Sequence, residues 1–211
     1  QQKVEARNFD IRKTLIKFDN VLNDQRHVVF SQRKNAMNSG NIFEYSDEFL
    51  KEIIQDILKL KVQNLSYPKN NEFSNRLKQI VGKSFTENEL KELISTKDDE
   101  IKKQITNKFV NLRNDRIKLL EENHAKEIEK RIFLQSIDLN WKSHIQYLEQ
   151  LRQVIGLRSY GQRDPLIEYK KEAFDLFSNL LEKLKLDFIT ILMNLKVVTE
   201  QPQKKEDEKP N

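Results

Sequence analysis

Apolar residues near the start of the chain recur at the spacing of one helix face. Val4, Ile11, Leu15, Phe18 and Leu22 are separated by 7, 4, 3 and 4 positions. Residues 1–39 contain neither glycine nor proline, so the pattern predicts one helix from near the start to about Met37, on the order of 50 Å long. The other face is polar, and it is either exposed to solvent or a surface on which other domains rest. Its residues are Arg7, Asn8, Asp10, Arg12, Asp19, Asn23, Asp24, Gln25 and Arg26.

Shorter helices are expected after the turn at residues 38–41. One carries Phe49, Ile53, Ile54, Ile57, Leu58 and Leu60, and a brief second one carries Phe73, Leu77, Ile80 and Val81. Thr86 and Glu89 have the spacing of a capping box, which predicts the start of another short helix. The region from about 39 to 95 therefore reads as a small helical subdomain inserted between longer elements.

A further long helical stretch is expected after residue 96, because residues 83–155 contain no glycine or proline. Thr96 and the acidic residues 98–100 suit a helix start, where negative charge opposes the helix dipole. Ile101, Ile105 and Phe109 continue the apolar face. A bend or break is expected within the charged stretch 113–131, at a position that the sequence leaves open.

The clearest pattern lies in the last third of the chain, where two apolar stripes have the same alternating spacing of 3 and 4. The first is Leu134, Ile137, Trp141, His144, Leu148, Leu151 and Ile155; the second is Phe174, Phe177, Leu181, Leu184, Phe188, Ile191 and Leu195. Between them, Gly156 suits a helix end, Asp164 a helix cap and Pro165 a first helical position. We therefore expect an antiparallel helical hairpin, whose arms pack on each other or together on a third body.

The loop at the tip of this hairpin should be exposed in either case. Its Arg158, Tyr160, Gln162 and Arg163 are of types that commonly contact partners. The alternative is that Tyr160 folds back and caps the end of the hairpin.

Composition narrows the class of protein. The chain is 37% hydrophobic and 34% charged, which favours an all-α fold with long exposed helices. A net charge of +5 is compatible with an acidic partner, but both signs are interspersed and no basic cluster contains stacking aromatics, so we expect no specific nucleic-acid binding. No apolar run is long enough to span a membrane. Residues 199–211 are expected to be a disordered linker.

Self-contained catalysis is not expected. The chain has no cysteine, hence no thiolate nucleophile and no Cys-ligated zinc. Residues 81–84 resemble the end of a phosphate-binding loop, but the required earlier glycine is replaced by Leu77. The histidines are far apart in sequence, and His144, on the apolar stripe, is expected to be a hydrogen-bonded core residue. We expect no catalytic residue, no metal site and no cofactor in this chain.

Two segments resemble the SecA family, the bacterial preprotein translocase ATPases. The run VEARNFDIRK from Val4 and the run FDNVLNDQR from Phe18 are similar to the family's long scaffold helix. The run LQSIDLNWKSH from Leu134 and the run LRSYGQRDP from Leu157 are similar to its two-helix finger and fingertip. The matches occur in the family's order over residues 1 to about 198. The chain lacks a leader and an initiator methionine, so we expect a piece of a longer protein.

The resemblance implies a division into a scaffold helix (1–38), a helical wing (39–121), a finger returning to the scaffold (122–198) and a linker (199–211). It implies that Asn8, Arg12 and Asp19 contact the motor domains, and that the tip around Tyr160 contacts the preprotein and the SecYEG channel. Further implied partners are the nucleotide-binding and preprotein-binding domains and anionic lipid, at the cytoplasmic face of the inner membrane. The finger region would restrain ATP hydrolysis.

ATP and Mg²⁺ would belong to motor domains outside this chain, and the family's zinc tail is absent from it. Ser159, Gly161 and Asn20 depart from the family's usual Gly, Ala and Asp. A stand-alone helical adaptor or a nucleic-acid-binding protein is the alternative function.

Overall fold

The computed structural model describes residues 2–38, 40–66, 72–157 and 164–197. These residues form seven α-helices and one 3-10 turn, with no strand among them, which confirms the all-α prediction. The elements are α1 (Gln2–Asn38), α2 (Ile42–Ser66), α3 (Glu72–Val81), η1 (Gly82–Ser84), α4 (Glu87–Ser95), α5 (Asp98–Leu120), α6 (Glu122–Ile155) and α7 (Pro165–Asn194).

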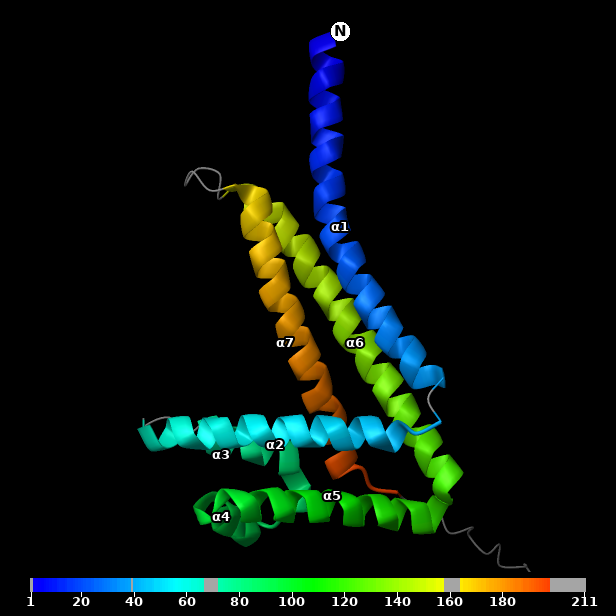
Figure 1. The fold of residues 1–211 in the computed structure, drawn as a ribbon, viewed down its shortest axis with the longest axis vertical. Helices are drawn as coiled ribbons and strands as arrows, with labels where there is room; N and C mark the ends of the chain where they lie inside the picture. Colours follow the sequence, from blue (N-terminus) through cyan, green and yellow to red (C-terminus); the bar gives the residue numbers. More distant parts are fainter. Residues whose placement is uncertain (1, 39, 67–71, 158–163, 198–211) are drawn as a thin grey trace, which may run out of the picture.

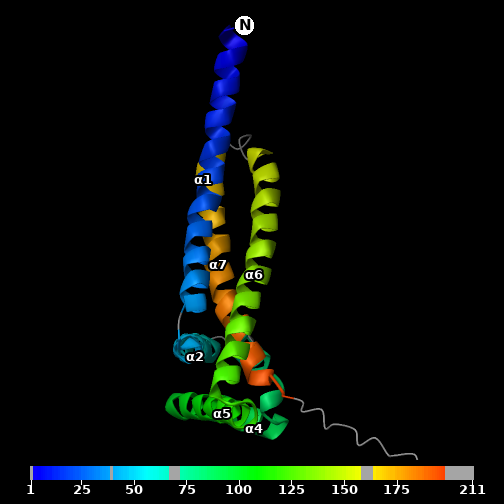
Figure 2. The same cartoon turned by 90° about the vertical axis from the view of Figure 1, so that its right-hand side faces the viewer.

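Three long helices, α1, α6 and α7, lie side by side and form what we call the stalk (Figures 1 and 2). The shorter helices α2–α5 lie across one end of the stalk, and we call this end the base. The N-terminal part of α1 extends beyond the opposite end of the hairpin (Figure 1). The molecule is therefore elongated, with the stalk along its length and the base at one end.

The predicted hairpin and its caps are confirmed. Helices α6 and α7 run antiparallel and pack along each other (Figure 1). Gly156 is the C-terminal cap of α6, and Pro165 occupies the first turn of α7. The Leu166 amide donates to Asp164 Oδ1 over 2.8 Å, as expected for a capping aspartate. In the base, Thr86 and Glu89 form the predicted capping box.

The predicted seam is right for α6 and partly wrong for α7. On α6 every stripe position from Ile137 onward is buried. On α7, Phe174 and Ile191 were expected in the seam but are 68% and 41% exposed. The residues buried there are Tyr169, Ala173, Leu180, Leu184, Leu186, Phe188, Ile189, Leu192 and Met193. The reason is that α7 packs against α1, α2 and α3 as well as α6, so its buried face is broader than a two-helix seam. Both expected arrangements therefore occur at once, because α6 and α7 pack on each other and both also pack on α1.

The buried face of α1 also differs from the expected one. Leu15 was predicted on the apolar face and is 42% exposed, whereas Gln25, assigned to the polar face, is only 8% exposed. Phe18, Val29 and Ala36 are buried. The expected face was set by residues 4–22, but the N-terminal part of α1 extends past the hairpin. The contact face follows the C-terminal part instead.

The break expected within 113–131 falls at one residue. Glu121 separates α5 from α6 and has φ +67° and ψ 157°, a conformation that side chains other than glycine rarely adopt. This corner turns the chain from the crosswise helices of the base into the stalk (Figure 1).

A second special turn ties the end of α7 to the base. Gly82 has φ +44°, and a Cβ there would lie 2.4 Å from the Asn194 side chain, so both backbone and space require glycine. Asn194 Oδ1 accepts from the Lys83 amide over 2.8 Å, and Asn194 Nδ2 donates to the Thr190 carbonyl. The segment 81–84, which resembles the end of a phosphate loop, is thus a helix-ending turn held by α7.

Candidate functional site: helix junctions and exposed helix ends

The predicted fingertip residues Arg158, Tyr160, Gln162 and Arg163 lie outside the described residues, so their contact role stays a prediction. The described residues on either side are unusually apolar for a surface. Large side chains with 52–68% exposure lie on the last turns of α6, just after its end, and on the first turns of α7: Tyr147, Val154, Leu157, Ile167 and Phe174. Side chains of this kind at one end of a hairpin are typical of a contact surface.

The predicted motor-contact residues all lie on α1. The Asn8 side chain lies outside the described part of the chain, and Arg12 is exposed. Asp19 accepts from Arg152 Nη1 of α6 over 2.8 Å. Asp19 is therefore engaged with the hairpin itself, and its contact with another domain remains a prediction.

Apolar contacts support that ion pair on its inner side. The Phe18 ring packs edge-on against Tyr169 with centroids 4.8 Å apart, and the Arg152 guanidinium lies 6.0 Å from the Phe18 ring. Burial raises the pKa of the Tyr169 hydroxyl. Helices α1, α6 and α7 all contribute to this contact, so the distal part of the stalk is a three-helix junction.

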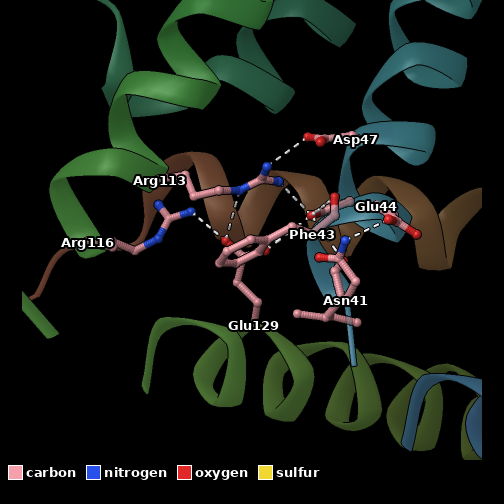
Figure 3. Close-up of polar contacts among 9 residues, drawn as sticks. Asn41, Phe43, Glu44, Asp47, Arg113, Arg116 and Glu129 are labelled. Carbon is pink, nitrogen blue, oxygen red and sulfur yellow. Dashed lines mark hydrogen bonds and ion pairs between the residues drawn. The ribbon is translucent and has the colours of Figure 1, made fainter. Parts of the chain in front are cut away.

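A charged cluster at the base joins four helices and was not found from the sequence (Figure 3). Its centre is Glu129 of α6, whose side chain is 0% exposed. Arg116 Nη2 donates to Glu129 Oε1 over 2.9 Å, and Arg113 Nε lies 3.6 Å from the same oxygen. Ser46 of α2 donates to Glu129 Oε2 over 3.1 Å. We call Arg113, Arg116, Glu129 and Ser46 the base cluster.

The two arginines extend the base cluster to neighbouring elements. Arg113 forms an ion pair with Asp47 over 2.9 Å, and its guanidinium lies over the rings of Phe43 and Phe109. Arg116 Nη1 donates to the Leu192 carbonyl of α7 over 3.0 Å. Both arginines, which come from α5, point toward Glu129 in Figure 3. The arrangement fixes α2, α5, α6 and α7 relative to one another, and we assign it a structural role.

A signal for the base cluster was present in the sequence. The apolar stripe of α5 continues at helical spacing into the arginines: Ile101, Ile105, Phe109, Arg113 and Arg116. On α6 the buried positions Ala125, Glu129, Phe133 and Ile137 are four residues apart. A charged residue that occupies an apolar stripe position indicates a buried ion pair.

A second buried polar group lies within the stalk. His144 is 3% exposed, and its Nε2 bonds to Gln25 Oε1 over 2.7 Å. Gln25 Nε2 donates to the Ala173 carbonyl over 2.9 Å, so one glutamine side chain connects α1, α6 and α7. Burial lowers the pKa of His144 to about 4, which keeps the imidazole neutral near pH 7. The expected hydrogen-bonded core histidine is confirmed.

The N-terminal part of α1 offers a further exposed surface. Phe9 and Ile16, in the N-terminal half of α1, are 65% and 58% exposed. Apolar side chains on a projecting helix favour contact with another body.

Within the described residues there is no cluster of three or more histidine, cysteine, aspartate or glutamate side chains able to hold a metal ion. None of the described helices combines the length and the apolar character that crossing a membrane requires.

The fold and these junctions define an all-α scaffold: long helices locked together, with exposed surfaces at their ends. Residues 1–196 match the family model described as the SecA wing and scaffold domain. The chain is 68% identical to a protein translocase subunit SecA of Pelagibacter ubique, over 98% of this chain and 25% of that protein. It is 36% identical to the protein translocase subunit SecA of Caulobacter vibrioides and 37% identical to the subunit SecA 1 of Rhodopseudomonas palustris. Each of these matches covers 96% of this chain and 22% of the relative.

The chain belongs to the SecA wing and scaffold family. It spans about a quarter of the length of the curated relatives that it matches.

Proposed function

We propose that this chain is the mechanical part of a protein-translocating ATPase. The single observation that carries the proposal is the packing of α1 along both arms of the hairpin, in a chain that matches SecA subunits over nearly its whole length. A body that displaces the projecting end of α1 would push on the packed three-helix stalk. Motion generated elsewhere would thereby reach the hairpin tip.

The proposed partners are those that the similarity to SecA subunits implies. The nucleotide-binding and preprotein-binding domains would rest on α1, including Asn8 and Arg12, and would hold the ATP and Mg²⁺. The tip, with Arg158, Tyr160 and Gln162, would contact the unfolded preprotein at the SecYEG channel. The exposed apolar residues beside the tip support a contact that accepts many sequences, because apolar contacts are not directional.

Two further parts of the proposal concern regulation and location. The junction of α1 with the hairpin would restrain ATP hydrolysis until channel and preprotein engage. The protein would work at the cytoplasmic face of the bacterial inner membrane, with anionic lipid as an additional contact. The chain alone would not hydrolyse ATP, and measurable hydrolysis by the purified 211-residue chain would contradict this assignment.

Site-specific crosslinking tests the tip. This chain contains no cysteine, so Tyr160→Cys introduces a single thiol into this region of the full-length protein. We expect that thiol to crosslink to a stalled preprotein. Leu139→Cys is the matched control, because Leu139 is 59% exposed on α6 and lies outside the group of apolar residues beside the tip. Equal labelling at both positions, or none at position 160 while translocation continues, would contradict the tip assignment.

A further inference from the structure

The buried Gln25 and His144 side chains form a single polar layer across the stalk. The Ala173 carbonyl can only accept, so the Gln25 amide nitrogen must face it. Gln25 Oε1 then faces His144 Nε2, which must carry the hydrogen that this oxygen accepts. Both hydrogen bonds have ordinary lengths, 2.9 and 2.7 Å, and together they fix the amide orientation and the histidine tautomer.

This layer lies where the apolar core of the stalk is divided. On the distal side is a small cluster: Phe18, Leu148, Leu151, Ile155, Tyr169 and Ala173. On the other side the main core begins with Val29, Trp141 and Leu180. The rings of Trp141 and Phe177 lie 5.6 and 5.7 Å from His144 and enclose the layer.

Apolar contacts alone define the axial register of packed helices poorly. A slide of one turn, about 5.4 Å, replaces one set of apolar neighbours by another of similar character. The same slide would place the Gln25 amide and the His144 imidazole among apolar side chains without partners. Such an unpaired buried polar group is costly, and a single one can fix register in helical assemblies.

The ion pairs between α1 and the hairpin are weaker determinants of register. In Asp19–Arg152 the two side chains are 60% and 36% exposed, and in Arg33–Asp138 they are 35% and 57% exposed. Long exposed side chains can follow a slide, and exposed pairs contribute little stability.

We propose that Gln25 and His144 are a register lock, a buried polar layer that fixes the axial position of α1 along the α6–α7 hairpin. The lock acts through orientation, because only one axial position satisfies the amide, the imidazole and the carbonyl together. It needs no partner molecule, and it does not depend on the function proposed above.

Distance measurements between spin labels test the lock. The native chain has no cysteine, so nitroxides attach only where thiols are introduced. Exposed Lys17 of α1 and Lys142 of α6 take the labels that report register, as Lys17→Cys and Lys142→Cys. Lys142→Cys with Lys170→Cys, both on the hairpin, is the control pair, because a slide of α1 leaves that distance unchanged.

The lock is removed in the double variant Gln25→Leu/His144→Leu, which makes the layer apolar. With native residues we expect one α1–α6 distance. In the double variant we expect a second distance, displaced by up to about 5 Å, with its population increased by about tenfold or more. The control pair should keep one distance in both backgrounds.

Three outcomes would overturn the proposal. The first is a double variant that keeps a single α1–α6 distance while remaining helical by circular dichroism. The second is a double variant that loses its helices, which would give the layer a role in folding instead of register. Finally, His144→Gln, which retains a donor toward Gln25, is expected to keep one distance, so two distances in that variant would also contradict the lock.

Discussion

The base and the stalk bury polar groups in different ways. The base uses full charges, with Arg113 and Arg116 around the fully buried Glu129. The stalk uses neutral dipoles, Gln25 and His144, in a layer that is equally sheltered. Loss of one partner leaves an unpaired charge in the base but only an unpaired dipole in the stalk, and the former is more costly. The base is therefore held more firmly to one arrangement, while the stalk needs less energy to rearrange.

The largest effect is expected in the base. Glu129→Gln keeps the shape of the side chain but removes the carboxylate that pairs with Arg116, and it leaves Arg113 with Asp47 as its remaining carboxylate partner. We expect the free energy of unfolding, measured by urea denaturation, to fall by about 3–5 kcal/mol. Glu127→Gln, at an exposed position two residues earlier, is the control and should change it by no more than about 0.5 kcal/mol. Equal effects of the two substitutions would remove the contrast between base and surface.

The stalk should respond to acid through His144. Burial lowers its pKa to about 4 in the folded chain, against an ordinary value of 6.5. Between these values the unfolded chain binds more protons, so stability falls as the pH decreases from 6.5 toward 4. The expected loss is about 3 kcal/mol in total.

Urea denaturation across this pH range measures that loss. The profile of His144→Gln supplies the reference, since it retains every other titrating group. Parallel profiles for the native chain and His144→Gln would show that the imidazole is not responsible.

A smaller effect, of opposite sign, is expected at the corner that joins base and stalk. Glu121→Gly should raise the free energy of unfolding by about 1 kcal/mol, because glycine adopts φ +67° without strain. Glu122→Gly, inside the first turn of α6, should instead destabilise by up to about 1 kcal/mol. Thermal unfolding of both variants measures the difference. A destabilised Glu121→Gly would mean that its side chain matters more than the backbone strain.

The smallest effect is expected for the Asp19–Arg152 pair on the surface of the stalk. A double-mutant cycle with Asp19→Ala and Arg152→Ala should give a coupling energy below about 1 kcal/mol, since both side chains are more than a third exposed. The same cycle on Arg116 and Glu129 should give a clearly larger value. Comparable couplings would contradict the distinction between buried and exposed pairs.

Local features of this fold were predictable from sequence. The capping box at Thr86, the end of α6 at Gly156 and the cap of α7 at Asp164 are set by neighbouring residues, and all three occur as predicted. The exact position of the corner at Glu121 was not predictable. The backbone conformation there is one that glutamate rarely adopts, and the packing of α5 against α6 imposes it.

Contacts between distant segments account for the other errors. Gln25 looked like a solvated residue because its partners are 119 and 148 positions away. Glu129 belonged to the charged stretch 113–131, for which only a bend or break was expected. The exposed Phe174 shows that spacing identifies an amphipathic helix more reliably than it identifies which stripe is buried. The fingertip residues were predicted from family resemblance, and they remain predictions.

The contact between Asn194 and the turn at Gly82 also has a consequence in time. The ribosome adds Asn194 111 residues after Lys83. At 5–20 residues per second this is a delay of roughly ten seconds. During that interval the turn lacks the side chain that holds its backbone, and the hairpin that completes the base is still being made. The crosswise helices can therefore reach their final packing only after α7 has been synthesised.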